Sequence, residues 1–131
     1  MNALPQWQET GKTILVVEDN VSARMALEAL LDALGFHVLA AGDATEAQAL
    51  FAAQADDIDL LISDMLLPHT NGPELYDLLK AQKPQLRCVL MSGYPLAEES
   101  ERLRRHGIEH WIQKPFDLRA MVVLLQSALG Q

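Results

Sequence analysis

The sequence predicts one α/β domain in which helices cover both faces of a five-stranded parallel sheet. Its 131 residues suit a single domain. From Lys12 onward, five short apolar runs alternate with stretches in which apolar residues recur at helical spacing. This alternation is typical of parallel strands joined by right-handed helical crossovers. Half of the residues are apolar and 21% are charged, which excludes a disordered chain.

The expected strands are the apolar runs. The first, residues 13–17, is apolar at nearly every position, as expected of a strand with both faces covered. The other strands are expected, in chain order, at residues 36–40, 58–63, 87–91 and 109–113. We expect residues 1–11, which are polar and lack periodicity, to form a tail or linker, and residues 12–131 to form the domain.

A stretch with helical signals follows each strand. Asp19 or Asn20 can cap the first helix, and Gly35 can end it in a left-handed conformation. Pro73 suits the first turn of the third helix, and Gly107 ends the fourth. The helices after the first are expected at residues 43–53, 73–82, 96–105 and 116–129.

The composition narrows the classes of function. The formal net charge is −8 at pH 7, and such an acidic domain repels the phosphates of nucleic acids. The single cysteine excludes an intramolecular disulfide and fits a reducing compartment. No apolar run approaches the ~20 residues that span a bilayer, and no signal-peptide pattern is visible at the start. We therefore expect a cytoplasmic protein that neither inserts into membranes nor binds nucleic acid directly.

Chemically active side chains follow four of the five strands: Glu18 and Asp19, Asp64, Ser92, and Lys114. Functional sites in such folds form at the carboxyl ends of the strands, so these groups meet if the first strand lies between the second and third. Three close carboxylates repel one another, and Mg²⁺, which prefers oxygen ligands, relieves that repulsion. The lysine and the hydroxyl then complete a clamp for a phosphoryl group. Asp64, at the centre of the set, is the expected nucleophile, giving an aspartyl phosphate.

These residues stand in segments that resemble the receiver domain of two-component response regulators. The matching segments are residues 14–20, residues 64–68 with Gly72, residues 91–94 and residues 114–116, and the resemblance covers about residues 13–129. It implies a flavodoxin-like fold with strand order 2-1-3-4-5. It also implies a phosphorelay signalling module rather than a metabolic enzyme, one that catalyses only its own phosphorylation and dephosphorylation.

The resemblance also implies roles for the metal and phosphoryl ligands. Asp64 is the expected phospho-acceptor, and a histidine kinase or histidine phosphotransfer protein is the expected donor. Glu18 and Asp19, together with Asp64 and the backbone carbonyl of Leu66, are expected to hold Mg²⁺. Lys114 is expected to pair with the phosphate.

Further roles concern the conformational switch. Ser92 is expected to bond the phosphoryl oxygen and move with it, while Trp111 occupies the aromatic switch position. Pro115 is expected to shape its turn through a cis bond. The fourth helix, fifth strand and fifth helix would then present a changed face to a downstream protein. Leu66 and Tyr94, each two residues past a site residue, are expected at the mouth of the pocket, where they would exclude water and lengthen the phosphorylated lifetime.

Two other classes compete with the receiver. A phosphatase of the haloacid-dehalogenase type also uses a strand-end aspartate, but that family has a second Asp where this chain has Leu66, and the chain lacks room for a substrate cap. A flavin or nucleotide binder typically has a Gly-rich phosphate-binding loop after the first strand. This chain has Glu18 and Asp19 there, which would repel a phosphate unless a metal intervened. No DNA-binding segment follows Leu129, so output through protein contacts is expected. The chain is either a stand-alone regulator or, as we favour, the receiver of a hybrid sensor histidine kinase.

Overall fold

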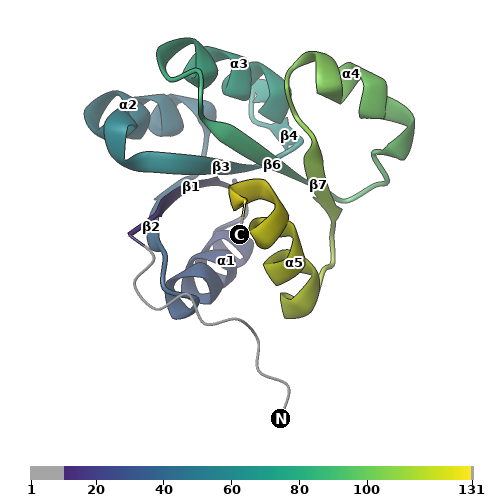
Figure 1. The fold of residues 1–131 in the computed structure, drawn as a ribbon, viewed down its shortest axis with the longest axis horizontal. Helices are drawn as coiled ribbons and strands as arrows, with labels where there is room; N and C mark the ends of the chain where they lie inside the picture. Colours follow the sequence, from purple (N-terminus) through teal and green to yellow (C-terminus); the bar gives the residue numbers. More distant parts are fainter. Residues whose placement is uncertain (1–10, 131) are drawn as a thin grey trace.

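A three-layer α/β domain is formed by residues 11–130, the part of the chain that the computed structural model describes (Figure 1). The central sheet is parallel, and its spatial order is β2 (His37–Ala41), β1 (Thr13–Val17), β3 (Ile58–Asp64), β6 (Arg87–Ser92) and β7 (His110–Gln113). Because β4 and β5 lie outside this sheet, the order is the predicted 2-1-3-4-5 when only its own strands are counted. The expected tail falls, apart from Gly11, outside the described residues.

The helices cover the two faces of the sheet unequally (Figure 1). One face carries α1 (Val21–Ala33) and α5 (Leu118–Leu129), and the other carries α2 (Ala44–Gln54), α3 (Gly72–Gln82) and α4 (Ser100–Arg105). Successive side chains of β1 alternate between them: Ile14 and Val16 pack with the core under α1 and α5, whereas Leu15 and Val17 pack with the core under α2 and α3. This double burial explains why β1 reads as an unbroken apolar run. Among the described residues, no helix has the length and apolar character needed to cross a membrane.

The ends of the helices follow the predicted signals, except at the start of the fourth helix, α4. Among the described helices, α1, α2, α3 and α5 each begin with an Asn or Asp whose side chain accepts a backbone N–H of the first turn. At α1 that residue is Asn20 rather than Asp19, so the cap does not occupy the Asp19 carboxylate. Gly35 and Gly107 have φ of 96° and 84°, as their helix-ending role predicts.

The fourth helix is shorter than predicted. Residues 97–99 form a 3₁₀ turn and only Ser100–Arg105 are α-helical. The physical reason is visible at Glu99, which precedes α4 and makes no side-chain cap hydrogen bond, so the N–H groups of the first turn lack a local side-chain acceptor. A small antiparallel hairpin, β4 (Leu66–Leu67) with β5 (Thr70–Asn71), was not predicted either; strands of two residues are too short to show alternation.

Gly72, at the start of α3, is in close contact with the end of β3. Its N–H donates to the Met65 carbonyl at 2.8 Å. A methyl group on Gly72 would lie 2.6 Å from the Asp64 carbonyl oxygen and 2.7 Å from Leu90 Cδ2. Only glycine fits this approach, which fixes the start of α3 against the strand end.

We predict that Gly72→Ala lowers the free energy of unfolding by about 1–3 kcal/mol, the usual range for overpacking. Urea denaturation measures the change. Gly93→Ala is the matched control, because a methyl group there meets nothing within 4 Å and should leave stability nearly unchanged. Equal stability of the two variants would contradict the close approach.

Candidate functional site

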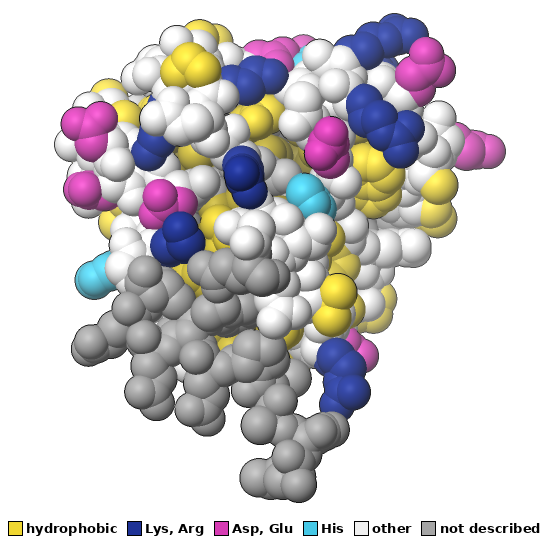
Figure 2. Space-filling model, in the orientation of Figure 1, with side chains coloured by type: hydrophobic (Ala, Val, Ile, Leu, Met, Phe, Trp, Pro, Cys, Tyr) yellow, Lys and Arg dark blue, Asp and Glu magenta, His cyan; other side chains and the backbone are white. Residues whose placement is uncertain are grey.

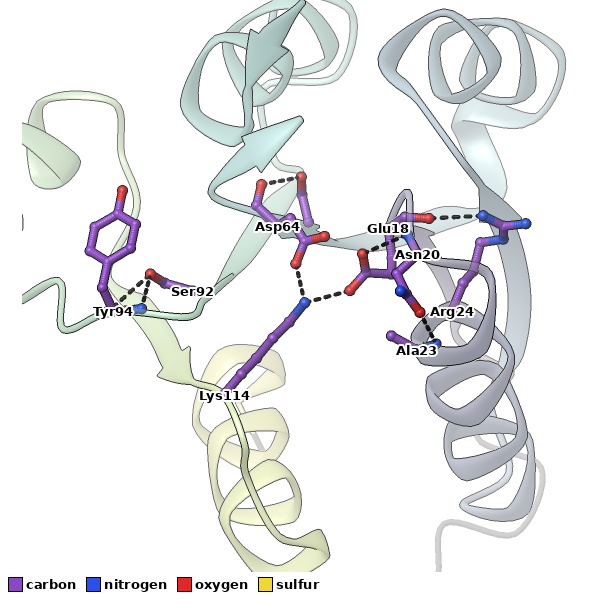
Figure 3. Close-up of polar contacts among 9 residues, drawn as sticks. Glu18, Asn20, Ala23, Arg24, Asp64, Ser92, Tyr94 and Lys114 are labelled. Atoms are coloured by element: carbon purple, nitrogen blue, oxygen red, sulfur yellow. Dashed lines mark hydrogen bonds and ion pairs between the residues drawn. The ribbon is translucent and has the colours of Figure 1, made fainter. Parts of the chain in front are cut away.

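The groups predicted at the strand ends do meet at one edge of the sheet (Figure 3). Glu18 follows β1, Asp64 ends β3 and Lys114 follows β7. The Lys114 ammonium lies between the two carboxylates: Nζ is 2.6 Å from Asp64 Oδ1 and also pairs with Glu18 Oε1. Both acids are buried, with 2% of Glu18 and 7% of Asp64 exposed. A buried pair of acids is tolerable here because the lysine offsets their charge.

Asp19 adds a third carboxylate to this cluster from the exposed side. Carboxylate oxygens of Glu18, Asp19 and Asp64 all lie within 4.8 Å of one another. An oxygen-only donor set that combines buried and solvent-facing acids matches the preference of hard divalent cations, which take a few carboxylates and keep several waters. The three residues therefore fit a cation of the Mg²⁺ type.

The two buried carboxylates share one proton unequally. Burial, reinforced by the neighbouring Glu18, raises the pKa of Asp64 to about 7 against the opposing influence of Lys114. Burial also acts to raise the pKa of Glu18, but hydrogen bonds with Asp64, Lys114 and the Asn20 backbone outweigh it and lower that pKa to about 2. Burial opposes the charge on Lys114, yet its two carboxylate partners raise its pKa. The lysine therefore stays cationic, and the pair of buried carboxyl groups takes up one proton near neutrality.

The turn that carries Glu18 is fixed by hydrogen bonds that the sequence did not reveal. The Asn20 N–H donates to Glu18 Oε2 at 3.1 Å, and the Glu18 N–H donates to the Ala41 carbonyl at 3.1 Å. Arg24 Nη1 donates to the Glu18 carbonyl oxygen at 2.9 Å. No sequence signal marks the first two, since they involve backbone groups, and Arg24 reads simply as a polar position on a helix.

Ser92 ends β6 next to this cluster but is engaged elsewhere (Figure 3). Its hydroxyl donates to the Tyr94 carbonyl at 2.6 Å and accepts the Tyr94 N–H at 3.0 Å. The hydroxyl is thus committed to its own loop rather than to Asp64. Leu66 and Tyr94, expected at the mouth of the pocket, are 64% and 39% exposed.

Two further predicted residues lie on β7 and after it. The Lys114–Pro115 peptide bond is cis, as the resemblance implied. Trp111 is half-buried and packs against the core under α2 and α3, so the strand that leads to Lys114 also carries the expected aromatic switch residue.

Comparison with known proteins identifies the family. Residues 14–126 match the model of the response regulator receiver domain, so the chain belongs to this family and is a receiver domain of two-component phosphorelay signalling. This assignment favours a regulatory domain over the phosphatase and the flavin- or nucleotide-binding alternatives.

The relatives are mostly longer proteins. Response regulator protein FleR of Pseudomonas aeruginosa is 35% identical over 119 residues, which are 90% of this chain and 25% of FleR. Sensor kinase CckA of Brucella abortus is 26% identical over 89% of this chain and 12% of its own length. The chain thus spans about a quarter or less of these relatives. The receiver domain of an HD domain-containing protein from Pseudomonas fluorescens superposes with a TM-score of 0.81 at 29% identity, covering 91% of this chain and 94% of that one.

The raised pKa of Asp64 predicts that cation binding depends on pH. A cation needs the ionised carboxylate, so below the Asp64 pKa of about 7 each ion must displace a proton. We expect the affinity for Mg²⁺ to rise as the pH increases toward 7 and to level off above it. Calorimetric titration with Mg²⁺ from pH 5.5 to 8.5 measures this, and an affinity that does not vary with pH would contradict the shared proton.

Proposed function

We propose that Asp64 accepts a phosphoryl group from a phosphohistidine and that the resulting charge switches a protein-binding face. The observation that carries the proposal is the buried Asp64 carboxylate, which faces the Lys114 ammonium at 2.6 Å with two further acids beside it. This arrangement combines a nucleophile with charge neutralisation, which are the main requirements of phosphoryl transfer.

The transfer exchanges one bond to phosphorus for another. An Asp64 carboxylate oxygen attacks the phosphorus, the P–N bond to the donor histidine breaks, and the histidine nitrogen keeps the electron pair. Lys114, free to leave Glu18, pairs with a phosphoryl oxygen. Glu18, Asp19, Asp64 and the Leu66 carbonyl would hold Mg²⁺, which when bound neutralises charge on the transferred group. The burial of Asp64 keeps competing water away from the reacting oxygen.

The response begins at Ser92. To bond the new phosphoryl oxygens, its hydroxyl must break its two hydrogen bonds with the Tyr94 backbone. The loop between Ser92 and α4 then moves toward Asp64. α4 is suited to displacement, because it has only six residues and no side-chain N-cap, and short elements with few contacts open most readily. Its C-terminal end is held by Lys80, which donates to the His106 carbonyl, and by the His106–Asp77 pair at 2.8 Å.

The surface of α4, β7 and α5 is the proposed contact for a downstream protein. The ion pairs Arg102–Glu99 and Arg105–Glu101 lie on α4 and on the 3₁₀ turn before it. Figure 2 shows dark blue and magenta side chains next to one another at the upper right, where α4 lies in Figure 1. Exposed ion pairs contribute little to folding, so they can exchange partners at low cost. Trp111 lies on β7, one of these three elements, and would report a rearrangement of this surface.

The proposed donor is a histidine kinase or a histidine phosphotransfer protein. The similarity to a sensor kinase over a small fraction of that protein's length supports the hypothesis that this receiver belongs to a hybrid sensor histidine kinase. We propose a cytoplasmic location, because the expected donors and the single buried cysteine both fit a reducing compartment.

We predict that Asp64→Asn abolishes uptake of label from acetyl phosphate in the presence of Mg²⁺, because the amide cannot form an acyl phosphate. Autoradiography after gel electrophoresis measures the uptake. Asp59→Asn is the matched control: Asp59 lies on the same strand and accepts the Thr13 N–H at 2.9 Å, which an asparagine oxygen also does. Labelling of Asp64→Asn at the parent rate would refute the proposal.

We also predict that the phosphorylated form loses phosphate several-fold faster in Leu66→Asn and Tyr94→Glu, because both side chains are expected at the mouth of the pocket, where they would exclude an attacking water. Release of inorganic phosphate after removal of the donor gives the rate. Leu78→Asn is the control, since Leu78 is similarly exposed but lies on α3. Unchanged rates in the first two variants would remove the shielding role.

A further inference from the structure

Arg24 contacts the site from the first turn of α1. Its side chain reaches back across the β1–α1 loop, and Nη1 donates to the Glu18 carbonyl oxygen at 2.9 Å (Figure 3). A hydrogen bond from a charged guanidinium is stronger than one between neutral groups. The acceptor of the Arg24 hydrogen bond is the carbonyl of the peptide group that joins Glu18 to Asp19, the two acids that lie beside Asp64.

Among residues 11–130, the carbonyl of that peptide group accepts no hydrogen bond from a neighbouring strand. The Glu18 N–H is paired with the Ala41 carbonyl of β2, but β1 ends at Val17, so the Glu18 carbonyl lies beyond the sheet ladder. Arg24 supplies the donor that the sheet does not. The Glu18 N–H is thus held by β2 and the Glu18 C=O by Arg24 of α1. With both backbone groups of Glu18 held, the directions in which the Glu18 and Asp19 side chains leave the turn are fixed.

Gly42, just after β2, provides the space for the guanidinium. A methyl group there would lie 3.1 Å from Arg24 Nη1 and 3.8 Å from Cζ. Gly42 is not among the glycines with positive φ, so room for Arg24, rather than backbone conformation, accounts for glycine at this position. The Gly42 N–H donates to Glu46 Oε1 at 2.7 Å, which keeps this loop in place.

We propose that Arg24, seated against Gly42, is a positioning residue for the cation and phosphoryl site. This inference rests on the proposed function, because it assigns Arg24 to the same acidic cluster. Arg24 touches neither the cation nor the phosphoryl group; it acts by holding the Glu18–Asp19 peptide so that both carboxylates converge with Asp64.

The sign of its effect separates positioning from simple charge. A cation near three carboxylates repels a divalent ion, so if Arg24 acted only through its charge, its removal would tighten Mg²⁺ binding. If it acts by positioning the turn, its removal weakens binding, as is usual when a partner that orients metal ligands is lost.

The test is calorimetric titration of the full chain with Mg²⁺ at pH 8. We expect Arg24→Ala to weaken binding about tenfold, the lower end of the range for such orienting partners. Arg87→Ala is the matched control, because Arg87 Nη1 also donates to a backbone carbonyl, that of Ala128 at 2.6 Å. The same charge is lost, but at the amino end of β6, whereas the acidic cluster lies at the carboxyl ends of the strands. Its Mg²⁺ affinity should equal that of the parent. Unchanged or tighter binding by Arg24→Ala overturns the proposal.

A double-mutant cycle makes the test independent of general destabilisation. Gly42→Val fills the space of the guanidinium and should weaken Mg²⁺ binding as well. Because both changes break one contact, the double variant should bind no more weakly than Arg24→Ala alone, whereas additive losses overturn the proposal. Absence of Mg²⁺ binding by the parent would overturn this inference and the proposed function together, whereas parent binding with an unaffected Arg24→Ala overturns this inference alone.

Discussion

The balance of charge among Lys114, Glu18 and Asp64 is the constraint around which this domain is organised. Two buried carboxylates on adjacent strands are costly unless a cation accompanies them. The ammonium of Lys114, which follows β7, is that cation, because it pairs with both acids. Its placement depends on β7 and on the hydrogen bond from its N–H to the Ser92 carbonyl at 2.7 Å. Any group that enters the site must therefore take over part of the neutralisation that Lys114 supplies.

The sequence was sufficient to predict the fold and the central residues of the site for a simple geometric reason. Parallel strands bring their carboxyl ends to one edge, so the reactive side chains that follow four of the five apolar runs are candidates for one site. Glu18, Asp64 and Lys114 were found in this way. The double burial of the strands made the runs easy to recognise, and the positive φ of Gly35 and Gly107 agrees with the helix ends that they marked.

What escaped prediction depends on groups that the sequence does not distinguish. The Asn20 N–H on Glu18 is a backbone donor that any residue supplies. Arg24 stands on a helix where a solvent-facing arginine is the ordinary reading, and only the folded β1–α1 turn shows its partner. The present partner of Ser92 is a backbone loop rather than the acid beside it. The shortness of α4 reflects a missing cap, which a run of charged residues with good helical spacing conceals.

The close packing of Gly72 against the Asp64 carbonyl also makes the space around Asp64 unequal on its different sides. At the start of α3, Gly72 packs tightly against the Asp64 carbonyl and Leu90, whereas Gly93, just after Ser92 at the end of β6, borders open space. A local expansion at Asp64 can therefore be relieved in one direction only. We therefore expect any displacement of the chain at Asp64 to leave the start of α3 in place and to occur on the side that bears Ser92.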